Sequence, residues 1–342
     1  MTGKNRSILR DQQGMALLIT VMTVSLLVAV TIMFHRKSWQ SYLVADSYKT
    51  HTQLKAIGDS GVNLGLALLG QDLKKNRYDS LLDSWAVIDE EELGSLFSNG
   101  QLELEIVDLS GRLQINRLVQ PAAKDPGSAG ENNTQEDIRT VLLQLLLSPS
   151  FALEEENEAY TIVDSLVDWI DEDERESDNG AESGYYLALE KPYECRNGPV
   201  QYIGELLLVK GISPELLFGK GEKKGLADYL TVYGKDGKIN INTVDSLLVK
   251  SLNPQISDEL AEKFHNFRID EDNEELLAAP GWYAKVDSWP GDIVLNEKLL
   301  TTQSTFFLIR STGKSDSLFR RVTAVVSRVD EKTLKVISRK VE

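Results

Sequence analysis

The longest hydrophobic pattern in the chain is an uninterrupted apolar run near the N-terminus. Residues 15–34 contain no charged side chain, and Lys4, Arg6 and Arg10 precede them. An α-helix rises about 1.5 Å per residue, so a run of this length can cross the roughly 30 Å hydrocarbon core of a bilayer. The pattern predicts one transmembrane helix. Its predicted anchor side chains include Leu17, Leu18, Ile19, Val24, Leu27 and Val30.

Helical spacing continues beyond the predicted span. Apolar residues recur at Leu54, Ile57, Leu64 and Leu68. Residues at this spacing share one face of a helix. The sequence therefore predicts a single long helix that extends from the membrane and packs its outer part on a domain. Cations flank the span on both sides, so the positive-inside rule does not set its orientation.

Two other parts of the chain alternate apolar and polar residues as strands do. Residues 101–118 alternate on both sides of a Ser110-Gly111 turn, which predicts a hairpin of two short strands. The C-terminal part predicts an antiparallel meander, with strands at 305–311, 317–328 and 333–339.

A helical block separates these strand regions. Residues 121–133 are rich in Gly, Pro and Asn and predict a loop or domain boundary. Helical periodicity follows over 134–287, which implies an α+β fold with an all-helical domain inserted between strands. The predicted helices are 138–147, 158–170, 203–209, 214–218, 244–252 and 257–267.

Composition narrows the classes of partner. The formal net charge is -16 at pH 7, with 42% hydrophobic and 26% charged residues, which is ordinary for a folded protein. Such acidity argues against a nucleic-acid partner and against docking of the globular part on an anionic lipid surface. The single cysteine, Cys195, excludes an intramolecular disulfide.

An acidic segment at 164–182 is the candidate metal site. Like charges this close repel one another, and a hard cation that takes six to eight oxygen ligands would compensate them. The EF-hand pattern is absent, and the lack of nearby His or Cys argues against zinc. The alternative is a solvated acidic face. The predicted calcium ligands are Asp168, Asp171, Asp173 and Glu182.

Two further patterns could indicate nucleic-acid binding or catalysis. Residues 202–212 and 239–243 resemble helix-hairpin-helix units, but only the first hairpin keeps a glycine, Gly211, and the chain is acidic, so we expect packing modules. His35, His51 and His265 are the three histidines, and no nucleophile has an evident His–carboxylate partner. The sequence predicts no catalytic residues and no enzyme.

The segment before the span resembles the class III signal of type IV pilins and pseudopilins. A short basic leader ends at Gly14, and the apolar helix starts at Met15. In that family a membrane peptidase cuts after the glycine and the helix remains as an anchor, which implies cleavage between Gly14 and Met15. A cleaved secretory signal fits poorly, because residues 35–39 read HRKSW; a plain uncleaved anchor is the other alternative. Most family members carry Glu where this chain has Ile19.

Four further segments make the resemblance more specific. Residues 108–116, 168–173, 180–186 and 239–243 are similar to the minor pseudopilin K family of type II secretion systems. The resemblance implies a pilin-like α+β fold with a SAM-like or helix-hairpin-helix-like insertion. The implied divisions are 1–14 cleaved leader, 15–34 transmembrane helix, 35–120 pilin-like helix and first strands, 121–290 inserted helical domain, and 291–342 C-terminal meander.

The same resemblance implies a role and partners. The subunit would join minor pseudopilins I, J and H at the tip of a pseudopilus and help to initiate its assembly for export of folded proteins. The family also implies processing by the prepilin peptidase, methylation, structural calcium, and a single-pass inner-membrane location with the domain in the periplasm. The alternative is a membrane-tethered calcium-binding adaptor unrelated to filaments.

Overall fold

The structure is a computed structural model. It describes residues 12–75, 77–119, 132–151, 153, 155–315, 318–330 and 333–342. Residues 1–11 of the predicted leader and 121–131 of the predicted loop lie outside this part of the chain.

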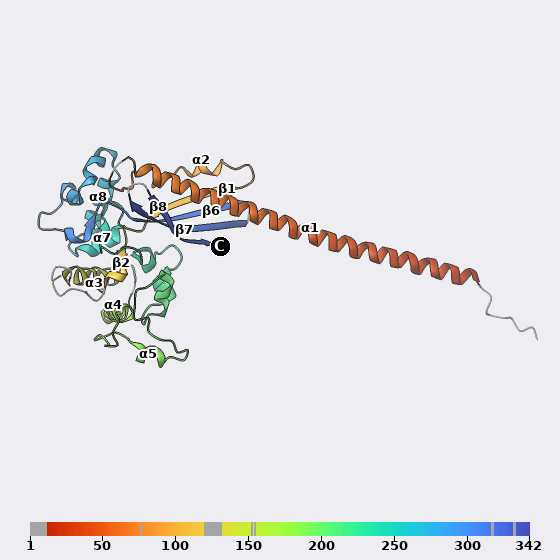
Figure 1. Ribbon diagram of the computed structural model, residues 1–342, viewed down its shortest axis with the longest axis horizontal. Coiled ribbons are helices and arrows are strands. Elements are labelled where there is room, and N and C mark those ends of the chain that lie inside the picture. Colours follow the sequence, from red (N-terminus) through yellow and green to blue (C-terminus); the bar gives the residue numbers. More distant parts are fainter. Residues whose placement is uncertain are drawn as a thin grey trace, which may run out of the picture.

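One long helix, α1 (Gln12–Asp72), dominates the shape of the molecule (Figure 1). Its 61 residues correspond to a length of about 90 Å. The N-terminal half is exposed, whereas Leu54, Ile57 and Leu69 are buried against the sheet. Among the described residues, this helix alone is long and apolar enough to cross a membrane. The prediction of a continuous helix from span to domain is therefore confirmed.

The outer part of α1 covers one face of a four-stranded sheet. The strand order is β1-β6-β7-β8, with every neighbouring pair antiparallel. The strands are β1 (Gln101–Asp108), β6 (Phe306–Ser315), β7 (Leu318–Asp330) and β8 (Thr333–Val341). Alternate residues of β1 are buried, because one face of the sheet packs on α1 and the other faces solvent. The predicted C-terminal meander is confirmed as β6–β8.

The core between α1 and the sheet consists mainly of aliphatic side chains, with the aromatic rings of Trp85 and Phe307 packed together within it. Leu102, Ile309 and Val322 from three strands meet Leu54 and Leu69 of α1. Trp85 packs edge-on against Phe307 with ring centroids 5.2 Å apart, next to the short helix α2 (Glu90–Gly94).

The predicted hairpin over 101–118 is wrong. Strand β1 pairs with β6, whereas β2 (Leu113–Gln114) pairs in parallel with β3 (Leu230–Thr231). The chain leaves the sheet at Ser110, whose hydroxyl accepts the amides of Thr305 and Phe306 at 3.0 and 3.3 Å. After the Ser110-Gly111 turn, the alternating residues belong to the helical region. Leu113 is buried in the core of that region and not in the core between α1 and the sheet.

The helical region lies between β1 and β6 in the chain. It contains α3 (Asn132–Leu146), α4 (Glu156–Ile170), α5 (Ser183–Leu187), α6 (Pro214–Phe218), α7 (Ser246–Leu252) and α8 (Asp258–Arg268). Short 3-10 helices connect them, at 115–117, 203–208, 226–228, 271–278, 280–285 and 297–299. A two-residue parallel pair, β4 (Ile239–Asn240) with β5 (Leu300–Thr301), lies at the end of the region that returns to the sheet.

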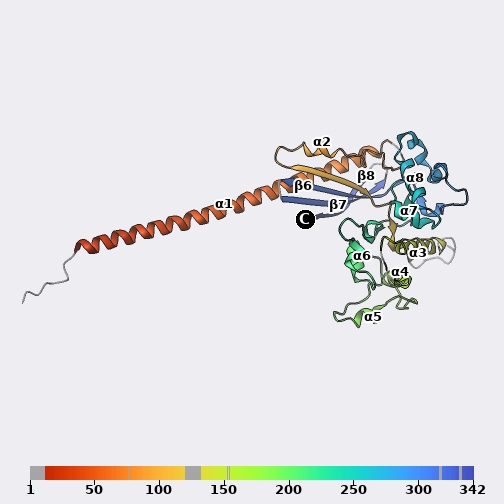
Figure 2. The ribbon, with the colours of Figure 1, turned by 180° about the vertical axis from the view of Figure 1, so that it is seen from behind.

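The helical region has one continuous apolar core. Residues of this core run from Leu113 to Leu300. The two segments that resemble helix-hairpin-helix units contribute Leu206, Ile239 and Ile241 to it, as expected of packing modules. Figures 1 and 2 show the region at the end of the sheet remote from the exposed part of α1, extending to one side of the helix axis.

Glycine at position 313 allows α1 to approach the sheet closely. A Cβ atom on Gly313 would overlap the carbonyl oxygen of Leu54, which is part of the helix backbone and has no rotamer to change. A Cβ atom on Gly70, further along α1, would meet only Leu334, at 3.7 Å. The two glycines therefore make a matched pair.

We expect opposite effects from the two alanine substitutions. Gly313→Ala should lower the free energy of unfolding by about 1–3 kcal/mol through overpacking. Gly70→Ala should be neutral or stabilise by up to about 1 kcal/mol, because alanine favours the helix. Thermal unfolding of the full chain in detergent micelles measures both. Equal effects of the two substitutions would contradict the close approach of α1 and β6.

Candidate functional site

Three carboxylates, two of them buried and one half-buried, meet where helix α4 ends. Asp168, Asp171 and Glu182 each place one oxygen so that all three lie within 4.8 Å of one another. Asp168 lies in the last turn of α4, Asp171 follows that helix, and Glu182 precedes α5. We call these three residues the α4 cluster. Asp168 is 0% exposed and Glu182 is 5% exposed, so water does not solvate their charges freely.

The loop after α4 is folded around Asp168. The Ser177 amide donates to both Asp168 oxygens at 3.1 and 3.2 Å, and the Ser177 hydroxyl donates at 2.5 Å. A Cβ atom on Gly180 would overlap the Asp168 carboxylate, so only glycine fits there. Lys210 donates through Nζ to the Gly180 carbonyl at 2.7 Å. These contacts bring Glu182 back to the end of the helix.

Three carboxylate oxygens of the other two members have no hydrogen-bond partner in the described part of the chain. Both carboxylate oxygens of Glu182 and Oδ1 of Asp171 are buried without a partner among the described residues. Burial, reinforced by neighbouring carboxylates, raises the pKa of Asp171 to about 6 and that of Glu182 to about 7. Unsatisfied buried carboxylates are costly. Oxygen donors converging in this way fit a hard divalent cation, which would remove that cost.

The structure places the fourth predicted ligand elsewhere. Asp173 is exposed, and its Oδ1 accepts the Arg175 amide at 2.8 Å. Its charge raises the pKa of Asp171, but its carboxylate is not part of the α4 cluster. Asp164 is also occupied, because Arg139 donates to it at 3.0 Å. The structure thus brings together three of the four residues that were predicted as ligands.

Cys195 lies in the same region as a buried thiol. Its Sγ donates to the Asp168 carbonyl at 3.6 Å. Burial raises the pKa of Cys195 to about 12, which favours the protonated thiol over the reactive thiolate.

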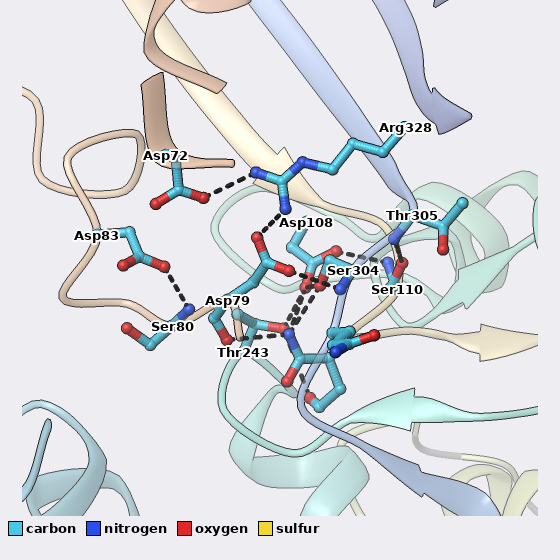
Figure 3. A network of polar contacts seen from close by, with 12 residues as sticks. Asp72, Asp79, Ser80, Asp83, Asp108, Ser110, Thr243, Ser304, Thr305 and Arg328 are labelled. Carbon is cyan, nitrogen blue, oxygen red and sulfur yellow. Dashed lines mark hydrogen bonds and ion pairs between the residues drawn. The ribbon is translucent and has the colours of Figure 1, made fainter. Parts of the chain in front are cut away.

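A second group of buried acids lies where the helical region joins the sheet. Asp72 at the end of α1, Asp79 and Asp83 have carboxylate oxygens within 4.8 Å of one another (Figure 3). Here a cation is already present. Arg328 of β7 donates to Asp72 at 2.7 Å and forms a second, shorter ion pair with Asp79. Its guanidinium also lies 4.5 Å from the centre of the Phe307 ring. The guanidinium therefore compensates this group, unlike the α4 cluster.

Asp108 extends this second group into the helical region. Its Oδ2 accepts from Asn240 at 3.1 Å and from the Ser304 and Thr243 hydroxyls at 2.5 Å each. Asn240 also donates to the Asp79 carbonyl at 3.1 Å. Burial raises the pKa of Asp108. We call Asp72, Asp79, Asp108, Asn240, Ser304 and Arg328 the junction network, because it ties the ends of β1 and α1 to the helical region.

Sequence reasoning did not predict the junction network. Asp108 and Asn240 were noted only inside two segments of family resemblance. Asp72, Asp79 and Arg328 lie up to 256 positions apart and belong to no local motif. The sequence offers one weak sign of this network. Asp108 is a polar residue at a buried position, at the end of strand β1 and directly before a turn.

Together, the anchor helix, the sheet that it covers and the helical insertion define a pilin-like membrane-anchored subunit. A family model described as "Type II secretion system (T2SS), protein K" matches residues 111–232. Type II secretion system protein K of Pectobacterium carotovorum subsp. carotovorum is 27% identical over 242 residues, covering 68% of this chain and 67% of the relative. The Aeromonas hydrophila protein of that description is 28% identical over 240 residues, covering 69% and 68%.

A solved structure has the same fold. The crystal structure of the GspK-GspI-GspJ complex from the type 2 secretion system of enterotoxigenic Escherichia coli contains a chain with a TM-score of 0.62 and 22% identity. The match covers 87% of this chain and 99% of that chain. By its family model and its curated relatives, the chain is similar to protein K of type II secretion systems, a minor pseudopilin and a structural component of the secretion machinery.

The junction network yields a prediction for Arg328. Arg328→Met would leave the Asp72 and Asp79 carboxylates buried without their cation. Removing one partner of such a buried pair costs about 3–5 kcal/mol at neutral pH. Arg310→Met is the matched control, because Arg310 pairs with Glu105, which is 59% exposed; such pairs contribute about 0–1 kcal/mol. Unfolding of the full chain in detergent micelles measures both.

The deficit of Arg328→Met should shrink in acid. Burial raises the pKa of Asp79 from 3.8 to about 7, and Arg328 is the main group that lowers it. A raised folded-state pKa means that the stabilisation from this group is present at low pH and is lost as the pH rises through about 7. Ionising the buried Asp79 carboxylate costs more when Arg328 is absent. The difference in stability between Arg328→Met and wild type should therefore be smaller at pH 5.5, where Asp79 is more protonated, than at pH 8. A deficit independent of pH would contradict an ionised Asp79 paired with Arg328.

Proposed function

We propose that this minor pseudopilin occupies the tip of a pseudopilus, with its domain in the periplasm, and helps to initiate assembly of the fibre for export of folded proteins. The observation that carries the proposal is the position of the helical region. It lies at the end of the sheet remote from the anchor and extends to one side of the α1 axis (Figures 1 and 2). A further subunit stacked on that end would collide with it, so the region suits a terminal position.

The anchor supports the same position. The resemblance to pilins implies that a carboxylate at the place of Ile19 pairs with the amine of the adjacent subunit, and isoleucine offers no such charge. Nearby polar side chains do not replace it. The hydroxyls of Thr20 and Thr23 donate to carbonyls of their own helix, at Leu17 (2.8 Å) and Ile19 (3.0 Å). A subunit that cannot pair with one ahead of it suits the leading position.

The proposed partners are the sibling subunits and the processing enzyme. The solved structure with the same fold is a complex with GspI and GspJ. We propose minor pseudopilins I and J as direct partners, with H below them. The prepilin peptidase would cut between Gly14 and Met15 and leave the anchor in the inner membrane. Methylation would follow the same processing route.

The mature N-terminus tests the processing step. The chain purified from membranes should begin at Met15 by intact mass, and Gly14→Val should keep the leader and lose co-purification with pseudopilins I and J. Gly70→Ala is the matched control and should be processed normally. A start at Met1, or beyond Lys37, would favour a tethered adaptor instead. Detection of this chain along the sides of the fibres by immunogold labelling, rather than at one end, would rule out the tip position.

We further propose that the α4 cluster holds a structural calcium ion. Asp168, Asp171 and Glu182 would supply carboxylate oxygens, with carbonyls or water completing six to eight ligands. The unpaired oxygens of Asp171 and Glu182 support the proposal. The ion would link the end of α4 to the start of α5 and so hold the acidic loop in place.

Calcium should raise the melting temperature of the full chain, and a chelator should reverse the shift. Asp171→Asn and Glu182→Gln should lose most of that shift, whereas Asp173→Asn should keep it, because Asp173 lies outside the cluster. Protons compete for these oxygens, and the pKa values of Asp171 and Glu182 are raised to about 6 and about 7. The calcium shift should therefore be largest at pH 8 and decline towards pH 5.5. An unchanged melting temperature with calcium at pH 8 would exclude the site.

A further inference from the structure

The part of α1 between the apolar run and the domain carries a charge pattern that the pseudopilin assignment leaves unexplained. From Gln12 to Ala45 the sequence contains no Asp or Glu, although the whole chain has 53 of them. The apolar run ends at Phe34, so the acid-free stretch continues beyond it. The charged residues in 35–45 are basic, including Arg36 and Lys37. Cations next to a membrane span are attracted to acidic lipid headgroups.

Two aromatic side chains lie directly after these cations. The rings of Trp39 and Tyr42 stack on the surface of α1 with centroids 5.8 Å apart and an interplanar angle of 27°. They are 57% and 60% exposed. Trp and Tyr are enriched at membrane–water interfaces because each ring combines an apolar body with a polar tip.

The rise of the helix places these residues at headgroup depth. Counted from Phe34, Arg36 and Lys37 lie about 3 and 4.5 Å further along the axis, and Trp39 lies about 7.5 Å further. The headgroup layer is roughly 5–8 Å thick on each side of the hydrocarbon. Tyr42 lies about 12 Å from Phe34, and its long side chain and the usual tilt of spanning helices allow it to reach the outer edge of that layer.

The domain does not cover this stretch. Residues 35–49 are all exposed, and Leu54 is the first residue of α1 to be buried against the sheet. Leu54 lies about 30 Å beyond Phe34, several times the Debye length of about 8–10 Å at physiological salt. The acidity of the domain is therefore screened from the headgroups and does not oppose their binding to the helix.

We propose that Arg36, Lys37, Trp39 and Tyr42 form a collar on α1 that binds the headgroups of acidic phospholipids in the leaflet facing the domain. The collar sets the height at which the helix leaves the bilayer. If the chain acts as a pseudopilin, the collar also resists extraction of the subunit, because these contacts break when the helix rises out of the membrane. The binding itself requires no filament.

Site-specific labelling of the full chain in vesicles tests the collar. Cys195→Ala removes the single native thiol, and Ser38→Cys then reports from inside the collar and Ser47→Cys from outside it. The probe is an uncharged polyethylene glycol maleimide. In vesicles of phosphatidylcholine with about 30% phosphatidylglycerol, labelling at position 38 should be about tenfold slower than in phosphatidylcholine alone. Labelling at position 47 should change less than about twofold, because that site lies beyond the screening distance.

Variants identify which side chains provide the protection. Arg36→Gln with Lys37→Gln should abolish the effect of phosphatidylglycerol, whereas Lys49→Gln with Lys55→Gln should keep it. Trp39→Ala with Tyr42→Ala should weaken it, with Tyr48→Ala as the aromatic control. Labelling indifferent to phosphatidylglycerol, or protection that survives loss of both cations, would overturn the proposal. Protection that appears only when pseudopilins I and J are added would assign this face of the helix to sibling subunits instead. These vesicles contain no siblings, so the result is independent of the tip proposal.

Discussion

The structure depends on the closure of a long insertion at a single point of the sheet. Strands β1 and β6 are neighbours, with Asp108 opposite Phe307, yet about 200 residues separate them in the chain. The cost of closing a loop grows only slowly with its length, so an insertion that folds on its own core is tolerated if its two ends are held together. The junction network holds them. Asp108 accepts from Ser304 across the closure, and Asn240 brings the insertion into the same set of bonds.

The structure contains two groups of acidic side chains, and their surroundings differ. At the junction, Arg328 lies between Asp72 and Asp79, and Asp108 accepts several hydrogen bonds, so each charge has a partner within the protein. In the α4 cluster, Glu182 has none among the described residues. Paired charges hold the junction in a fixed arrangement, although Asp72 Oδ1 and Arg328 Nε have no hydrogen-bond partner among the described residues. The unpaired carboxylate oxygens of the α4 cluster would be stabilised by a bound cation. The proposed calcium ion therefore belongs at the α4 cluster and not at the junction, where Arg328 supplies the positive charge.

Sequence patterns predicted the parts of the fold that depend on local periodicity. The apolar run, the long helix and the C-terminal meander follow from the spacing of residues such as Leu54 and Ile309, which needs no knowledge of distant contacts. The hairpin over 101–118 failed because alternation shows that a strand is half-buried but not which strand it pairs with. Asp173 lies outside the α4 cluster, with its carboxylate accepting the Arg175 amide, and the junction network joins residues from both ends of the domain. The position of Asp173 has no signature in a single sequence, and the junction network left only the weak signal of Asp108 at the end of a strand.

Helix α1 connects three environments without a break, and this continuity relates the proposals to one another. Its first part matches hydrocarbon, the exposed stretch at 35–49 carries the proposed collar, and its last part, from Leu54 to Asp72, is held by the sheet and by Arg328. A straight helix transmits an axial displacement along its length. A push at the membrane would therefore reach the sheet through the α1 core and the helical region through the junction network. Loss of Arg328 would weaken that path at its last step and leave the anchor and the collar unchanged.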